Sequence, residues 1–174
     1  MNKKQIPCGK VDFKSLIEEN CFYVDKTAIL KSLFDDLSGN DVTLITRPRR
    51  FGKTLTMSML NYFLSMNYAN PDDKSLQLQL FKDTSLIKDT DFCIKHMGQY
   101  PVIAISFKDV DFDSFEPSYR LLASKIAELV GKFEFLLDSE KLSNEDKKIC
   151  KKLLDYDYLI DENNKDILTS SLFF

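Results

Sequence analysis

Apolar positions recur with helical spacing along much of the chain. In residues 11–20, Phe13, Leu16 and Ile17 fall on one face of a helix. A capping-box pattern that starts at Ser143 predicts a later helix. The segment 74–95 holds one or two short helices, and the acidic residues 155–164 are typical of a turn. The same spacing predicts longer helices over 26–37 (with Asp25 as N-cap), 53–67 and 117–131.

Two apolar runs break this helical spacing and predict strands. They cover Val42–Ile45 and Val102–Phe107, and their continuous apolar character is typical of buried parallel strands. A shorter β-prone run covers residues 21–24. We therefore expect an α/β fold similar to P-loop NTPases, with a mainly parallel sheet flanked by helices. Two clear strands are few for such a sheet, so we expect it to be incomplete.

The first predicted strand leads into the most informative stretch of the sequence. After the strand come a turn, then Gly52, Lys53 and Thr54, and then a predicted helix. This order favours a phosphate-binding loop, because the N–H groups that begin a helix lack intrahelical partners and attract anions. Gly52 would let the backbone approach, Lys53 would reach the outer phosphates, and the Thr54 hydroxyl would ligate Mg²⁺.

The loop departs from the general P-loop pattern. Arg47 takes the place of the first glycine, and Pro48 has no N–H to donate. The simpler alternative is a helix that begins after Gly52, with Lys53 and Thr54 merely solvated. The three arginines at 47, 49 and 50 argue against that alternative, since they repel one another and the helix dipole unless an anion lies beside them.

These residues resemble a known protein family. The segment Arg47–Thr54 resembles the arginine-rich loop of the bacterial AAA-ATPase-like proteins. Tyr23–Thr27 and Tyr100–Asp109 look like two further segments of that family. The resemblance implies that ATP and Mg²⁺ bind here, with Thr54 on the metal and Tyr23–Thr27 flanking the nucleotide. It implies these nucleotide contacts: Arg47, Pro48, Arg49, Arg50, Phe51, Gly52, Lys53, Thr54 and Leu55.

Full-length relatives are expected to carry a Walker B strand and often a C-terminal domain of the PD-(D/E)XK nuclease type. Neither is evident in the sequence. Asp161 and Glu162 imitate the acidic end of a Walker B strand, but Asp157 interrupts the short apolar run before them. We therefore expect residues 1–174 to be the N-terminal part of an ATPase domain that binds Mg-ATP and hydrolyses it little. The apolar end, Leu172–Phe174, favours the same interpretation and predicts some self-association.

A second function remains open at this point. The loop of a non-enzymatic interaction module would use the same arginines to contact nucleic-acid phosphates or an acidic protein. Nucleic acid is also a conceivable partner of full-length relatives.

Composition narrows these alternatives. The 174 residues hold 24 Lys and Arg against 27 Asp and Glu, a net charge of −3 that argues against a generally basic, nucleic-acid-binding surface. No apolar run approaches the length of a membrane span. His96 is the single histidine, and the four cysteines form no C-x-x-C pair, which disfavours a zinc cluster. Scattered cysteines suit a reducing cytoplasm, where we expect the protein to be located.

Overall fold

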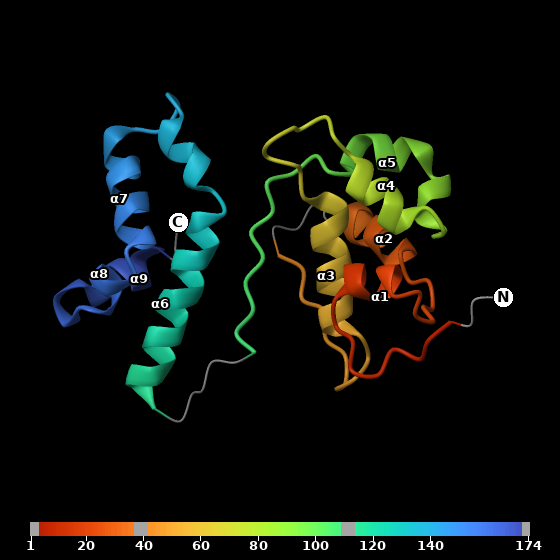
Figure 1. Cartoon of the computed structure of the whole chain (residues 1–174), viewed down its shortest axis with the longest axis horizontal. Helices are drawn as coiled ribbons and strands as arrows, with labels where there is room; N and C mark the ends of the chain where they lie inside the picture. Colours follow the sequence, from red (N-terminus) through yellow and green to blue (C-terminus); the bar gives the residue numbers. More distant parts are fainter. Residues whose placement is uncertain (1–3, 37–41, 109–113, 172–174) are drawn as a thin grey trace. The chain divides into compact units, whose positions relative to one another are not determined.

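A computed structural model describes residues 4–36, 42–108 and 114–171 of the chain. These residues form two compact units, Met1–Val102 and Ile103–Phe174 (Figure 1). Each unit is built from helices around its own apolar cluster. The candidate loop lies in the first unit.

The first unit contains five α-helices and one short 3₁₀ helix among its described residues. A twelve-residue helix, α3, carries the candidate loop at its N-terminus (Figure 1). Helix α1 packs against both α3 and α4. The helices are α1 (Phe13–Glu18), α2 (Ala28–Asp36), α3 (Lys53–Leu64), α4 (Ser75–Phe81), η1 (Leu86–Lys88) and α5 (Thr90–His96).

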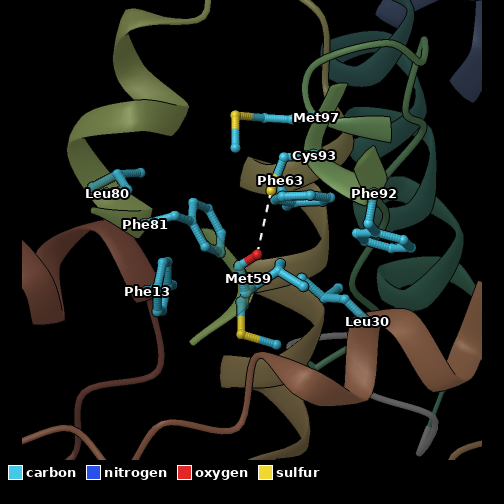
Figure 2. Packing of buried hydrophobic residues seen from close by; sticks show 10 residues of the cluster. Phe13, Leu30, Met59, Phe63, Leu80, Phe81, Phe92, Cys93 and Met97 are labelled. Atoms are coloured by element: carbon cyan, nitrogen blue, oxygen red, sulfur yellow. Dashed lines mark hydrogen bonds between the residues drawn. The ribbon is translucent and has the colours of Figure 1, made fainter. Parts of the chain in front are cut away.

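Aromatic side chains dominate the core of the first unit. The rings of Phe13 and Phe63 lie against Phe81, with centroids 5.0 and 5.2 Å from it. Figure 2 shows these rings beside Met59 of α3 and Leu30 of α2. Burying one such side chain stabilises the fold by about 1.5–3 kcal/mol. The core therefore fixes α3 from several sides.

The predicted parallel sheet is wrong for the described residues. They contain isolated β-bridges, Gln5 with Cys21 and Ser65 with Tyr100, but no strand. Residues 42–48 and 101–107 lie in no helix or strand despite their β-branched composition, and no ladder joins them to a neighbour. Val42 and Leu44 are each 83% exposed and Ile103 is 70% exposed, so these runs are not buried strands. The β-propensity of a segment is a local property of its sequence, whereas a sheet also requires neighbouring strands with which the segment can pair.

Two helices are shorter than the sequence predicted. Helix α3 ends at Leu64 and not at Asn67, because the next residues pair with Tyr100: its N–H donates to Leu64 O (3.0 Å), and its carbonyl accepts from Met66 N (2.9 Å). Helix α2 begins at Ala28, because the Asp25 carboxylate accepts the Thr27 N–H at 2.9 Å and holds a turn before the helix.

The second unit is a cluster of helices around Ala123, Leu159 and Leu168, all buried. Helix α6 packs against α7 and α8, and the Tyr119 hydroxyl donates to Leu159 O at 2.8 Å. The predicted capping box at Ser143 is confirmed, whereas the acidic segment predicted as a turn contains a helix, α8, capped by Asp155. The elements are α6 (Phe115–Gly131), η2 (Glu134–Asp138), α7 (Asn144–Leu154), α8 (Tyr156–Ile160), η3 (Glu162–Asn164) and α9 (Lys165–Ser171).

Candidate functional site

The loop before α3 is shaped by two residues with left-handed backbone conformation. Arg50 has φ 68° and Gly52 has φ 78°. Gly52 is the N-cap of α3, and its carbonyl accepts the Thr56 N–H at 2.8 Å. A Cβ added at Gly52 would meet no atom within 4 Å, so backbone conformation and not crowding favours glycine here.

The first turn of α3 presents backbone donors. The N–H groups of Lys53, Thr54 and Leu55 precede the point at which intrahelical bonding begins, so they have no helical carbonyl partner. No side chain of the N-cap residue accepts from them, because that residue is Gly52. The end of the helix therefore carries partial positive charge with donors free to meet an anion.

Positive side chains surround this helix end. Arg47, Arg49, Arg50 and Lys53 are exposed, and the sequence from Val42 to Pro71 contains no Asp or Glu. In the described part of the chain, none of the four forms an ion pair with a carboxylate. Charge accumulates here without internal compensation, which favours an anionic ligand.

The Lys53 side chain folds back across the loop. Its Nζ donates to the carbonyl oxygens of Arg47 (2.5 Å) and Pro48 (3.0 Å). These bonds hold the arginine-rich turn against the start of α3. Neutral carbonyls leave the ammonium charge uncompensated, so the same group is able to exchange these contacts for phosphate oxygens.

A second segment, residues 22–27, faces the start of α3. Tyr23 is half-buried, and its ring meets Phe13 edge-on with centroids 5.4 Å apart. The Tyr23 hydroxyl donates to Met59 Sδ (3.4 Å) and accepts the Lys26 N–H (3.2 Å). Tyr23 thus anchors the segment to α3, whereas its neighbours Phe22 and Val24 are 58% and 59% exposed.

The Asp25 carboxylate fixes the far end of this segment. It accepts the Thr27 N–H and hydroxyl at 2.9 and 2.7 Å, and the Ser85 N–H at 2.6 Å. Burial would raise the pKa of Asp25, but these donors outweigh it and lower the pKa to about 2. Asp25 is therefore ionised at neutral pH and serves to join segment 22–27 to the residues before η1.

Another carboxylate joins α1 to α3. Asp12, the N-cap of α1, accepts from Ser15 N (2.8 Å) and from Ser58 Oγ (2.9 Å), while Ser58 Oγ accepts the Phe13 N–H (2.9 Å). Burial works against ionisation of Asp12, but the Ser15 and Ser58 donors lower its pKa overall. Ser58 lies one turn after Thr54, so this contact holds the loop-bearing end of α3.

A cavity of about 230 Å³ opens between the two segments. Phe22, Val24 and Lys26 line one side of it, and Gly52, Leu55 and Thr56 line the other. The structure thus brings two predicted loop residues, Gly52 and Leu55, to the same cavity as the Tyr23–Thr27 segment.

The remaining predicted residues lie as follows. Arg47–Phe51 form the exposed turn, and Thr54 is exposed on the first turn of α3. Asp161 and Glu162 lie in the second unit, where Asp161 follows α8 and Glu162 begins η3, and not at the end of a strand. There Asp161 caps η3 by accepting the Asn163 N–H at 2.8 Å. Asp109, which ends the third family segment, lies outside the described residues.

Among the residues that the structure describes, no group of three or more His, Cys, Asp or Glu is placed to hold a metal ion. No helix in the described ranges combines the length and apolar character that a membrane crossing requires.

Sequence reasoning included Val24 in the flanking segment Tyr23–Thr27 but missed Phe22, which precedes that segment. The alternation of these two residues with the anchored Tyr23 carried the signal, because positions two apart in an extended segment share a face. It also missed Ser58, whose role depends on a contact with Asp12 that is 46 positions away in the chain.

Comparison with known proteins adds one finding. A family model described as predicted AAA-ATPase, the AAA-ATPase-like family, matches residues 7–169. Searches of curated proteins and of solved structures returned no match. Because the family match spans most of the chain, the protein belongs to the AAA-ATPase-like family, and that membership supports an ATP-binding, ATPase-like function in general terms.

Proposed function

We propose that residues 47–55 bind the phosphates of Mg-ATP. The observation that carries the proposal is the positive charge at the N-terminus of α3, where exposed cations and backbone donors converge and none of the cations pairs with a carboxylate of the described residues. Phosphate groups satisfy both kinds of group at once. Membership of the AAA-ATPase-like family supports the same class of ligand, a nucleotide.

Each side chain has a distinct part in this proposal. Lys53 would release the carbonyls of Arg47 and Pro48 and contact the outer phosphates. Arg49 and Arg50 would contact phosphate oxygens with their planar forks, as a lysine could not. Gly52 would keep the backbone close to the ligand.

The residues present also fit a magnesium ion held mainly by phosphates. Mg²⁺ typically keeps several waters and takes few protein ligands, so the exposed Thr54 hydroxyl is a sufficient protein donor. When bound, the ion would neutralise charge on the phosphates. Thr54 is the residue of this chain that would position it.

We further propose that the chain hydrolyses ATP slowly. Phosphoryl transfer needs a residue that orients the attacking water. Asp12 and Asp25, the carboxylates that hold α1 and segment 22–27, are both engaged by O–H and N–H donors. Asp161 and Glu162 are exposed in the other unit, at the N-cap and the first residue of η3.

The test is titration of a fluorescent ATP analogue with Mg²⁺. The parent should bind it, and Lys53→Ala should weaken binding at least tenfold, since a charge-assisted contact contributes about 1.5–3 kcal/mol. Lys82→Ala removes another exposed lysine of the same unit and is the matched control. Equal affinities for all three proteins would refute the proposal. Retention on DNA that ATP does not compete away would favour the interaction-module alternative.

A further inference from the structure

A groove in the first unit shares no lining residue with the phosphate loop. It is lined by residues of α4, η1 and α5, and residues 47–55 are not among them. Its volume is about 410 Å³, within the range of roughly 300–1,000 Å³ that is usual for clefts that bind small molecules. A ligand of this groove would therefore be separate from the nucleotide proposed at the start of α3.

Helix α5 gives the groove one straight face. The lining residues Thr90, Cys93, Ile94 and Met97 are spaced i, i+3, i+4 and i+7, so they form a single stripe along the helix. Seven residues of α-helix rise about 10 Å. Because a C–C bond is about 1.5 Å long, an extended chain of about eight carbons matches the length of this stripe.

The groove has a buried floor and exposed walls, both apolar. Cys93 and Met97 are buried and belong to the core of the first unit (Figure 2). Leu78 of α4 and Ile94 of α5 are 52% and 76% exposed. A ligand that covered these two side chains would remove apolar surface from water, so the groove favours an apolar ligand.

A single charged residue, Lys74, is part of the lining. Lys74 is half-buried, and its Nζ donates to the carbonyl oxygens of Pro71 (2.7 Å) and Gly98. An ammonium group has three N–H donors, so one remains for a ligand. Gly98 directly follows Met97, which places the charge at one end of the apolar stripe.

The charge of Lys74 is not balanced inside the protein. Within the part of the chain that the structure describes, Lys74 forms no ion pair with a carboxylate. The other polar lining residues, Thr90 and Gln99, are neutral, and Gln99 Nε2 is already bonded to Ile94 O (3.3 Å). A partly buried cation with only neutral partners favours an anionic group beside it.

We propose that this groove binds a small monocarboxylic acid with an apolar chain of about eight carbons. The chain would lie along the stripe on α5, between Leu78 and Ile94. The carboxylate would accept a hydrogen bond from Lys74 Nζ. This site does not depend on nucleotide binding at the start of α3.

The experiment uses two probes with the same chain and different charge. Octanoate and octan-1-ol are titrated against the ¹⁵N-labelled chain, and affinities are taken from the amide shifts of Leu78, Ile94 and Met97. Lys74→Met removes the charge and keeps a long, flexible side chain. Leu78→Glu places a carboxylate on one wall. Leu76→Glu makes the same change at another exposed leucine of α4, outside the groove, and is the matched control.

We expect the parent to bind octanoate saturably and octan-1-ol roughly tenfold more weakly, because the alcohol lacks the charge-assisted contact. Lys74→Met should bind octanoate as weakly as the parent binds the alcohol, with unchanged affinity for octan-1-ol. Leu78→Glu should lose octanoate binding, whereas Leu76→Glu should match the parent.

Four results would overturn the inference. The parent could fail to bind octanoate, or it could bind both probes equally, in which case the carboxylate is not recognised. Equal weakening of both probes by Lys74→Met would show that Lys74 only supports the shape of the groove. Unchanged octanoate binding by Leu78→Glu would place the acid elsewhere on the protein. None of these results bears on the phosphate loop.

Discussion

Arg50 and Gly52 both have positive φ, but Gly52 alone is free of the associated strain. A side chain at φ 68° brings its Cβ close to the backbone, which costs roughly 1–2 kcal/mol. Strain of this kind persists where the surrounding structure enforces it and is concentrated at functional sites. We propose that the Arg50 guanidinium offsets this strain by binding a ligand.

Replacing Arg50 separates strain from charge. Arg50→Gly and Arg50→Ala both remove the guanidinium, but alanine keeps the strained backbone. We expect Arg50→Gly to be more stable than Arg50→Ala by about 1 kcal/mol in urea unfolding, with the same loss of Mg-ATP affinity in both. Identical stabilities of the two variants would show that the backbone at position 50 is not strained.

The ionisation of Asp25 predicts how its contribution to the stability of the fold depends on pH. Its folded pKa of about 2 lies below the unfolded value of about 3.9, so ionised Asp25 stabilises the fold above pH 3.9 and this contribution is lost as the pH falls towards 2. We expect Asp25→Asn to cost about 1 kcal/mol at pH 7, a modest figure because the group is exposed to solvent. The cost should shrink at pH 2.5.

The measurement is the free energy of unfolding at both pH values. Asp72→Asn, at an exposed aspartate of the same unit, is the control and should change little. A cost for Asp25→Asn that does not vary with pH would show that the network with Thr27 and Ser85 does not depend on the ionised carboxylate.

At the scale of elements, helix α3 connects the core to the loop. Met59 and Phe63 bury one face of it, Ser58 binds Asp12, and the first turn is left to present Thr54. Helices α1, α3, α6 and α7 were predictable from sequence because their signals are local: apolar spacing, and caps such as Ser143. Helix α8 was not, because its acidic segment was predicted as a turn. The early end of α3 was not predictable, since it depends on pairing with Tyr100, a distant residue.

Substitutions of Thr54 test whether its hydroxyl binds Mg²⁺. Thr54→Ala should weaken ATP binding in the presence of Mg²⁺ and leave it nearly unchanged when EDTA removes the metal. Thr54→Ser keeps the hydroxyl and should behave like the parent. A defect of equal size with and without Mg²⁺ would assign Thr54 a structural role in the first turn.

At the scale of the whole molecule, two separate apolar clusters replace the single sheet-centred core that the sequence favoured. The segments 42–45 and 102–107 carry strong β-propensity but form no strand, because propensity says nothing about which neighbour completes a ladder. The cationic loop could be predicted from the sequence, because charge and the position of glycine are local properties. The cavity could not be predicted, because it is formed by residues 22–26 together with α3.

Because each unit has its own apolar cluster, we expect the two units to differ in their stability to unfolding. Leu159 is fully buried in the second unit, so Leu159→Ala should cost that unit about 2–5 kcal/mol. In hydrogen exchange, amides of α6 and α8 should lose protection while those of α3 and α5 keep theirs. Equal loss of protection in both units would show one cooperative core instead of two.

The central claim is that phosphates bind at the start of α3, and amide chemical shifts test it directly. Titration of ¹⁵N-labelled protein with Mg-ATP should move the N–H resonances of Gly52, Lys53, Thr54 and Leu55 most. The amides of Asn144 and Glu145, at the capped start of α7, should stay in place because Ser143 already satisfies that helix end. Saturable shifts centred on residues 52–55 are the predicted result. Shifts that leave these four amides unchanged would contradict the account.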